Sequence, residues 1–293
     1  MLPAVAPQPT VAIIGPGRLG STLVRELTDA GYSVAELISR DNADSLRKAR
    51  RLSKSIHARA AITKNASYDA GLIWLCVPDR EIARVGRDMA VSARWKGKQW
   101  NGKIVFHSSG ALSSDELNAL RRKGAAVASV HPLMTFVRGS IPSLRTVPFA
   151  VEGDAVAVRL ARQVVKALGG VAFAVRKKDK VAYHAWATLA SPLLVAALVT
   201  VEQVAGAAGL SAADARNNIM PIVSQTIANY AQLGPAGASS GPIVRGDTDI
   251  VHQHVRALQK LPEARAVYLA LARSAMRYLP VRNRKKLKKA LIR

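Results

Sequence analysis

The chain has 293 residues, of which 49% are hydrophobic, and a single cysteine, Cys76. This length allows two domains with separate cores, and the hydrophobic content is too high for a disordered chain. One cysteine excludes a disulfide framework, so we expect a cytoplasmic protein. Lys and Arg number 43 against 19 Asp and Glu, a formal net charge of +24. The basic residues are spread along the chain without interleaved aromatic residues, so we expect no specific nucleic-acid partner.

The segment that begins at residue 11 predicts a nucleotide-binding turn. An apolar run over residues 11–14 leads into Gly15-x-Gly17-x-x-Gly20 and then into a helical pattern. The first glycine allows a tight turn, the second lets the backbone approach a diphosphate, and the third lets helix and strand pack closely. The helix N-terminus then presents free N–H groups to the phosphates. The expected cofactor-binding residues here are Gly15, Pro16, Gly17, Arg18, Leu19 and Gly20.

The end of the second strand, residues 32–38, predicts which dinucleotide is bound. An acidic residue there would bind the ribose 2′-hydroxyl of NAD, but this chain has Ser39 and Arg40. A hydroxyl and a guanidinium suit a 2′-phosphate, so we expect NADP(H). In the alternative, Arg40 is a solvated loop residue and Asp41 binds the ribose. Further cations near this pocket are Arg18, Arg47 and Lys48.

Residues up to about 176 alternate short apolar runs with amphipathic stretches, which is typical of a parallel sheet. Further expected strands are residues 71–77, 103–106, 125–130, 147–151 and 171–175. Expected helices are residues 43–54, 79–90, 113–123 and 154–168. Asp79 is placed to cap its helix, and Ser113 with Glu116 forms a capping-box pattern. We therefore expect an α/β fold with a doubly wound Rossmann sheet over residues 1–176.

Beyond residue 177 the pattern becomes helical, which predicts an all-α domain over residues 177–293. The helical patterns cover residues 179–208, 211–233, 249–260 and 262–278, with a glycine-rich loop at 234–246. The longest apolar stretch, residues 189–201, is too short to cross a bilayer, so we expect no membrane span. A helix that is apolar on nearly all sides is buried within protein, which places this one at a domain or subunit interface.

Four motifs follow the glycine turn in a fixed order. They are His107-Ser-Ser-Gly-Ala-Leu112, Val130-His-Pro-Leu-Met-Thr-Phe136, Tyr183-His-Ala185 and Gly241-Pro-Ile-Val-Arg-Gly-Asp247. Together they resemble the Rossmann-like proteins that carry a DUF2520 domain, which are similar to pyrroline-5-carboxylate reductases and the 6-phosphogluconate dehydrogenase-like group. The resemblance implies an N-terminal dinucleotide-binding domain, an all-α substrate and dimerisation domain, and a homodimer. Where the resemblance leads us to expect Ser-Asn, this chain has Ser191-Pro192, so any ligand role of that Asn is lost.

Several candidate site residues fall at the carboxyl ends of the expected strands, where ligands of doubly wound sheets bind. Val77, Pro78 and Asp79 are expected beside the nicotinamide ribose. Ser108 is a candidate catalytic residue, and Ser109 with Gly110 a candidate substrate-binding pair; equally, these three residues simply turn the chain. A neutral His131 would polarise a carbonyl, or else it ties down a loop.

The proton donor is expected near the start of the first long helix. His184 is our candidate general acid, with Lys180 one turn earlier as a second donor, whereas the alternative is a buried structural histidine. In the glycine-rich loop, Arg245 and Asp247 are expected to bind substrate, or to form a structural ion pair. No histidine spacing matches a metal motif, so we expect no metal.

These features predict an NADP(H)-dependent oxidoreductase that transfers a hydride to or from a small, anionic carbonyl or imine substrate. The alternative is an NADP-binding sensor without turnover, which Pro192 and the absence of a Lys–Asn pair on one helix favour. A third reading, a basic protein of nucleic acid or membrane surfaces, rests on the net charge and the basic tail over residues 282–293.

Overall fold

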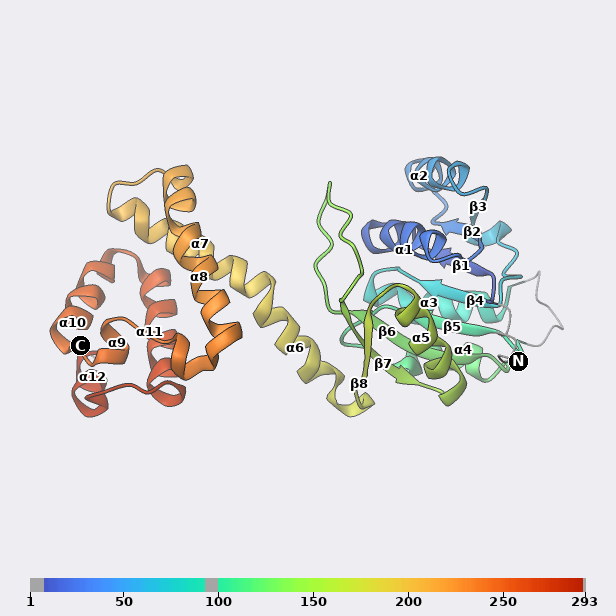
Figure 1. The fold of residues 1–293 in the computed structure, drawn as a ribbon. Helices are drawn as coiled ribbons and strands as arrows, with labels where there is room; N and C mark the ends of the chain where they lie inside the picture. The colour runs from blue at the N-terminus through green and yellow to red at the C-terminus, as the bar shows by residue number, and fades with distance from the viewer. Residues whose placement is uncertain (1–7, 93–99, 292–293) are drawn as a thin grey trace, which may run out of the picture. The chain divides into compact units, whose positions relative to one another are not determined.

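The computed structural model describes residues 8–92 and 100–291. They form two compact units, Met1–Thr188 (unit 1) and Leu189–Arg293 (unit 2), which are described separately below (Figure 1). The division lies further along the chain than the expected start of the helical domain at residue 177. The reason is that the first part of helix α6 (Lys180–Ala190) belongs to unit 1, where Lys180 and Tyr183 are buried.

Unit 1 is built on one eight-stranded sheet in the order β3-β2-β1-β4-β5-β6-β7-β8. Its strands are β1 (Val11–Ile14), β2 (Val34–Ser39), β3 (Arg59–Ile62), β4 (Leu72–Leu75), β5 (Ile104–His107), β6 (Ala126–Pro132), β7 (Pro148–Gly153) and β8 (Val171–Ala174). All neighbours pair in parallel except β6 and β7. The chain runs outward from β1 to β3 and then crosses back to β4, so a topological switch point lies between β1 and β4. Ligands of such sheets bind at this point.

Helices cover both faces of the sheet, which confirms the expected doubly wound α/β fold. Successive residues of β1 alternate between two cores: Val11 and Ile13 face one, Ala12 and Ile14 the other. The first core includes side chains of α1 (Arg18–Asp29), α2 (Ala43–Lys54) and α5 (Ala155–Ala167). The second includes side chains of α3 (Asp79–Ala90), of the 3₁₀ turn Ser114–Leu117 and of α4 (Asn118–Arg121). A strand buried on both faces is apolar throughout, which explains why β1 and β4 were readable from the sequence.

Three local expectations for unit 1 were wrong. Strand β3 was not expected, because it is a short edge strand of partly exposed residues. The helix expected at 113–123 is a 3₁₀ turn, Ser114–Leu117, followed by one α-turn, α4 (Asn118–Arg121), and Ser113 Oγ accepts from the Asp115 amide rather than completing a capping box. Asp79 does not cap α3, since its carboxylate accepts a hydrogen bond from Ser109 Oγ instead.

In unit 2 the described residues contain helices and no strand, as expected. They are α7 (Pro192–Ala207), α8 (Ala212–Ala238), α9 (Pro242–Arg245), α10 (Thr248–Ala257), α11 (Pro262–Tyr278) and α12 (Arg284–Ala290). Val251, Val255, Ala272 and Leu287 are central to the core, so the basic tail is anchored by its apolar face. The region expected as a loop at 234–246 is partly helical: α8 continues past a break at Gly234 (φ +68°), and α9 follows.

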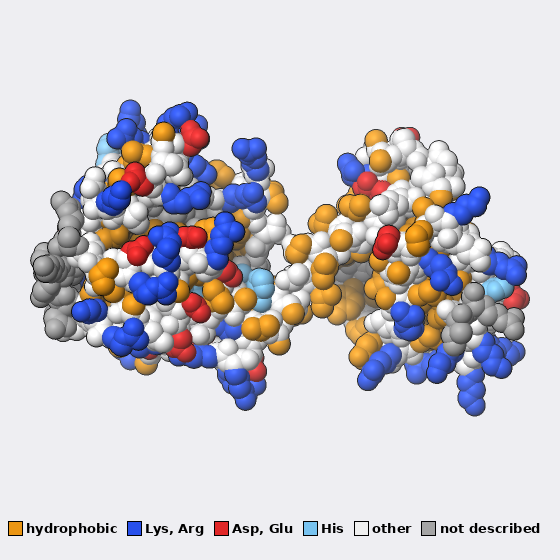
Figure 2. Space-filling view, turned by 180° about the vertical axis from the view of Figure 1, so that it is seen from behind, with side chains coloured by type: hydrophobic (Ala, Val, Ile, Leu, Met, Phe, Trp, Pro, Cys, Tyr) orange, Lys and Arg blue, Asp and Glu red, His pale blue; other side chains and the backbone are white. Residues whose placement is uncertain are grey.

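Two long helices of unit 2, α7 and α8, have little of their surface covered. None of the side chains of α7 is buried, and in α8 only Ala215 is. Figure 2 shows hydrophobic side chains gathered over the surface of this unit. Within the described residues, one helical stretch, Lys177–Ala207, has the length and composition to cross a membrane, and none of its apolar window is buried. The expectation from residues 189–201 alone understated its length, because α6 and α7 follow one another directly. A single stretch of this kind is weak evidence for a membrane span.

Candidate functional site

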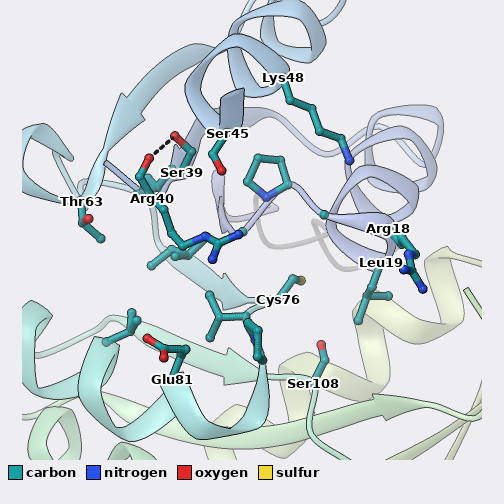
Figure 3. A pocket seen from close by; sticks show the side chains of 18 of the residues that line it. Arg18, Leu19, Ser39, Arg40, Ser45, Lys48, Thr63, Cys76, Glu81 and Ser108 are labelled. Atoms are coloured by element: carbon teal, nitrogen blue, oxygen red, sulfur yellow. Dashed lines mark hydrogen bonds between the residues drawn. The ribbon is translucent and has the colours of Figure 1, made fainter. Parts of the chain in front are cut away.

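A cavity of about 810 Å³ opens at the carboxyl ends of β1, β2, β4 and β5 in unit 1 (Figure 3). Its volume is in the range of small-molecule and cofactor sites. The side chains and backbone that line it come from Ile14, Gly15, Pro16, Gly17, Arg18, Leu19, Ile38, Ser39, Arg40, Ser45, Lys48, Thr63, Cys76, Val77, Pro78, Glu81, Arg84, Val85, Ser108 and Arg138. The cavity therefore lies at the switch point of the sheet.

The glycine turn forms the floor of this cavity, and its three glycines have different roles. Gly15 has φ +90°, and a Cβ there would lie 2.7 Å from the Cys76 carbonyl oxygen. A Cβ on Gly20 would lie 2.3 Å from the Gly15 carbonyl oxygen, so Gly20 lets α1 pack onto the strand. A Cβ on Gly17 would have only one neighbour, at 3.9 Å. Gly17 is thus the glycine whose missing side chain leaves room for a ligand.

The N-terminus of α1 lies at the same turn and has no side-chain cap. The amides of the first helical turn have no partner within a helix, so they are suited to bind phosphate oxygens. These features fit the diphosphate of a dinucleotide: an open glycine position, uncapped amides and Arg18 at the rim of the cavity.

Cationic side chains outnumber acidic ones in the lining of the cavity. The cations are Arg18, Arg40, Lys48, Arg84 and Arg138, and the single acid is Glu81. Glu81 pairs with Arg84 at 2.5 Å, and Arg84 also pairs with Asp88. The Arg84 guanidinium lowers the pKa of Glu81, which therefore stays ionised. The other four cations form no ion pair in the part of the chain that the structure describes, although the charge of Arg40 also lowers the pKa of Glu81.

At the β2 end of the cavity, Arg40 and Lys48 lie with the hydroxyls of Ser45 and Thr63. Ser39 Oγ donates to the Arg40 carbonyl at 3.1 Å, which fixes the turn that presents Arg40. Asp41, the alternative ribose ligand, is absent from the lining and pairs with Lys64 at 3.0 Å. Arg47 is likewise outside the lining and pairs with Asp44.

The buried His107 holds the loop after β5 in place through two hydrogen bonds. Its Nδ1 accepts from the Ser109 amide at 3.1 Å and its Nε2 donates to the Ser113 carbonyl at 3.0 Å. Burial lowers the pKa of His107 to about 4, so the ring is neutral at pH 7. The fastened loop presents Ser108 to the cavity, where Ser108 Oγ accepts from Trp74 Nε1 at 2.8 Å. Ser109 is buried, and its Oγ donates to Asp79.

A second polar cluster lies against this loop and joins β6 to α6. Lys180 is 1% exposed, and its Nζ donates to the Ser109 carbonyl at 3.0 Å and to Ser129 Oγ at 2.5 Å. Burial lowers the pKa of Lys180 to about 8. Because two of its three donors bind protein groups and it does not line the cavity, Lys180 holds the loop in place in this structure.

His131 and Tyr183 form a hydrogen-bonded pair in the same cluster. The His131 Nδ1 and Tyr183 Oη atoms are 2.8 Å apart. The pKa of His131 is lowered to about 4, mainly by burial and to a smaller extent by the positive charge of Lys180. Burial raises the pKa of Tyr183 to about 12, so its hydroxyl stays protonated and donates to the neutral imidazole. His184 is half-buried, with its ring centroid 6.2 Å from that of His131. A Cβ on Gly110 would lie 2.6 Å from His184 Cδ2 and 3.0 Å from His131 Nε2.

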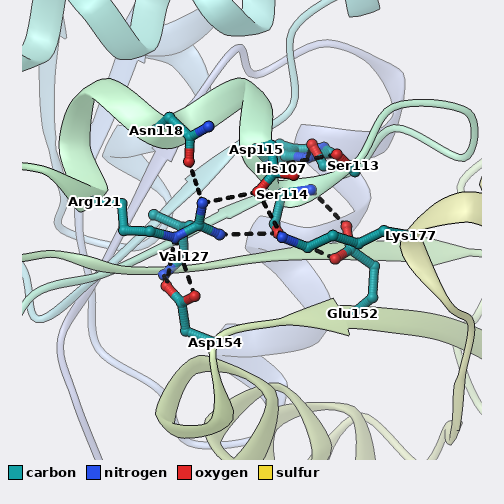
Figure 4. Close-up of polar contacts among 10 residues, drawn as sticks. All are labelled: His107, Ser113, Ser114, Asp115, Asn118, Arg121, Val127, Glu152, Asp154 and Lys177. Carbon is teal, nitrogen blue, oxygen red and sulfur yellow. Dashed lines mark hydrogen bonds and ion pairs between the residues drawn. The ribbon is translucent and has the colours of Figure 1, made fainter.

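A polar network beneath the loop ties its far end to β7 and to the start of α6 (Figure 4). Glu152 accepts from both the amide and the hydroxyl of Ser114. Arg121 pairs with Asp154 at 3.0 Å, and Asp115 pairs with Lys177. These contacts are made between protein groups, and we assign them to the support of the loop.

The structure thus brings most of the predicted residues together in unit 1 but divides them into two sets. The set that lines the cavity is Gly15, Pro16, Gly17, Arg18, Leu19, Ser39, Arg40, Val77, Pro78 and Ser108. The set that does not line it is Gly20, Asp79, Ser109, Gly110, His131, Lys180 and His184. Arg245 and Asp247 lie in unit 2, where they form an ion pair at 2.8 Å. The polar lining residues without a predicted role are Ser45, Thr63, Glu81, Arg84 and Arg138.

Comparisons with known proteins agree with this architecture. Residues 5–132 match the family model of a Rossmann-like domain, and residues 147–275 match that of a domain of unknown function, DUF2520. The chain therefore carries both domains, which confirms the resemblance. None of the curated proteins compared with the sequence matches it.

Solved structures that are similar in fold include the following three. A candidate NADP oxidoreductase from Bacteroides fragilis has a TM-score of 0.72 and 18% identity, over 91% of this chain and 97% of its own. A reductive aminase from Aspergillus terreus, in complex with NADPH and ethyl-5-oxohexanoate, has a TM-score of 0.65 and 15% identity, over 97% and 99%. A pyrroline-5-carboxylate reductase from Coxiella burnetii has a TM-score of 0.58 and 14% identity, over 92% and 98%. At these identities the likeness establishes the fold.

Proposed function

We propose that this chain is an NADP(H)-dependent oxidoreductase that transfers a hydride to or from a small, anionic carbonyl or imine compound. The observation that carries the proposal is the cavity at the switch point, where an open glycine position and an uncapped helix N-terminus meet four cations without acidic partners. Proteins named as NADP or NADPH-binding reductases share the fold, which supports the same class of activity.

The β2 end of the cavity supports NADP(H) over NAD(H). Arg40 and Lys48 supply positive charge, and Ser45 supplies a hydroxyl, where the 2′-phosphate of the adenine ribose would lie. Asp41, the group that would favour NAD, is paired with Lys64. We assign recognition of the 2′-phosphate to Arg40 first, because its turn is held by Ser39.

When bound, the nicotinamide supplies or accepts the hydride; the protein orients the substrate and supplies or accepts the proton. We keep His184 as the proposed general acid, since it is half-buried and next to His131. Lys180, proposed as a second donor, is better placed as a positioning residue, because its Nζ binds the carbonyl of Ser109. His131 stays neutral at pH 7 and receives a hydrogen bond from Tyr183, which fixes its ring.

Turnover separates the enzyme from a sensor that binds NADP without reaction. The purified chain is mixed with NADPH and a panel of oxo acids and cyclic imines, and the loss of NADPH absorbance is followed. We expect oxidation with at least one compound, and a rate that falls about 10²-fold in His184→Ala with unchanged NADPH affinity. Binding of NADPH without turnover across a broad panel would favour the sensor instead.

We also propose that the chain works in the cytoplasm as a homodimer, with residues 177–293 serving substrate binding and dimerisation and residues 1–176 binding the dinucleotide. The uncovered apolar side chains of α7 and α8 support a partner surface in unit 2. Sedimentation equilibrium tests the oligomeric state: we expect twice the chain mass, and a monomer at micromolar concentration would contradict the dimer.

A further inference from the structure

The sheet order separates the cations of the cavity into two groups. Arg40 follows β2, whereas Arg138 lies in the loop that follows β6, and β1, β4 and β5 lie between these strands. With neighbouring strands about 4.8 Å apart, β2 and β6 are separated by roughly 19 Å. This spacing applies to the strand ends, whereas Arg138 itself reaches the cavity on the loop that follows β6. The diphosphate turn after β1 lies between the two.

The loop that carries Arg138 is held along α1. Arg18 Nη1 donates to the Phe136 carbonyl at 3.4 Å, and the Leu144 amide donates to Glu26 Oε2 at 3.2 Å. Arg25 Nη2 donates to the Ile141 carbonyl at 3.4 Å. These contacts, made on both sides of residue 138, position the loop so that Arg138 lines the cavity while Val137 and Ile141 are exposed.

The Arg138 guanidinium has no acidic partner among residues 8–92 and 100–291. By contrast, Arg84 in the same cavity is neutralised by Glu81 and Asp88. A guanidinium presents a planar fork of donors that matches a carboxylate, and it stays charged at any physiological pH. Ser108, at the end of β5, also lines the cavity, and its hydroxyl is fixed by Trp74.

We propose that Arg138 binds the carboxylate of the substrate, and that the substrate class is a 2-oxo acid or the corresponding imino acid. This inference rests on the proposed function, because the β5 and β6 side of the sheet is the reacting side only when the adenine ribose lies at Arg40. In this proposal the adjoining carbonyl or imine group faces the part of the cavity that Ser108 lines. In this role Arg138 is a specificity-determining residue of the site.

Binding to the NADP⁺-loaded full-length chain tests the proposal without turnover. Three 2-oxo acids of increasing size and their neutral amides are titrated by calorimetry into the wild type, Arg138→Gln and Arg138→Lys. We expect the wild type to bind at least one acid about 10-fold or more tightly than its amide. We expect Arg138→Gln to weaken the binding of that acid by about 10- to 100-fold and to leave the binding of the amide unchanged, as for a lost charged hydrogen bond. Arg138→Lys should recover only part of the affinity, because Lys cannot form the fork.

The matched control is Arg145→Gln, an exposed arginine of the same loop that does not line the cavity; it should bind acid and amide as the wild type does. NADPH affinity is measured for every variant. Equal binding of acid and amide by the wild type, or equal losses in Arg138→Gln, would overturn the proposal. A parallel loss of NADPH affinity in Arg138→Gln would also overturn it, by showing that Arg138 binds the cofactor. Failure of the wild type to bind NADPH would instead contradict the proposed function and, with it, this inference.

Discussion

At the scale of single residues, the glycine turn makes the sharpest distinction between folding and binding. Gly20 has no room for a Cβ, because the Gly15 carbonyl oxygen would lie 2.3 Å away, whereas Gly17 has room on the protein side. We expect Gly20→Val to lower the free energy of unfolding by about 1–3 kcal/mol. Gly17→Val should keep wild-type stability and lose NADPH binding. Urea unfolding and NADPH titration of both variants check this, and a Gly17→Val protein with wild-type affinity would contradict the turn assignment.

Arg40 tests the cofactor preference in the same way. Its guanidinium lines the cavity and has no carboxylate partner in the described residues, so its loss should remove a charged hydrogen bond to the 2′-phosphate. We expect Arg40→Ala to weaken the binding of NADPH by about 10- to 100-fold and the binding of NADH by less than about twofold. Arg47→Ala, which removes an arginine paired with Asp44 outside the cavity, is the control. Equal losses for both dinucleotides would place the 2′-phosphate elsewhere.

The buried Lys180 predicts a pH dependence of stability. Its folded pKa of about 8 lies below the ordinary lysine pKa of 10.5, so above pH 8 the unfolded chain binds more protons at this site. The contribution of Lys180 to stability should therefore rise with pH, by about 2–3 kcal/mol between pH 8 and pH 10.5. Urea unfolding at a series of pH values gives the free energy of unfolding for the wild type and for Lys180→Met. The two plots of this free energy against pH should diverge over this range. Lys178→Met, an exposed neighbour, should follow the wild type; parallel curves for Lys180→Met would contradict the burial.

The sequence predicted the residue types of the site better than their partners. The turn residues 15–20 and Arg40 were predictable because a local strand, turn and helix fix their positions. The contacts of His131 with Tyr183, and of Lys180 with Ser109 and Ser129, join residues far apart in sequence. No local periodicity encodes such pairs. Arg138 had no pattern at all, since its place depends on how a long loop is held by α1.

At the scale of elements, the buried strands were predicted and the exceptions were local. β1, β4 and β5 read as apolar runs because both of their faces are covered. β3 is a short edge strand, and the 3₁₀ turn at residues 114–117 depends on Glu152, which is distant in sequence. The glycine-rich stretch at 234–246 was read as a loop, although it contains helical turns around Gly234 and over α9.

The break in α8 makes a prediction of its own. Gly234 has φ +68° and ψ −177°, a conformation that essentially only glycine adopts. We expect Gly234→Ala to lower the free energy of unfolding by about 1–3 kcal/mol. Gly206→Ala in α7 is the control: its Cβ would meet nothing within 4 Å, and removing a helical glycine should raise stability by about 0.5–1 kcal/mol. A stable Gly234→Ala protein would show that α8 is continuous.

At the scale of the whole molecule, the two units differ in how much of their apolar surface is buried. Unit 1 closes two cores around one sheet, whereas α7 and most of α8 leave their apolar side chains exposed. The net charge of +24 is also distributed over the chain rather than confined to the cavity. In the cavity the positive charge is concentrated at one site, because five cations and a single acidic residue line it.

The most direct test is an equilibrium titration of the wild-type chain with NADPH and with NADH at fixed salt. The arrangement of the turn, the uncapped helix and Arg40 predicts that both dinucleotides bind at one site per chain, and that NADPH binds at least about 10-fold more tightly. The preference should shrink as salt is raised, because it depends on the charge of the 2′-phosphate. Absence of binding, or equal affinity for the two dinucleotides, would contradict the account.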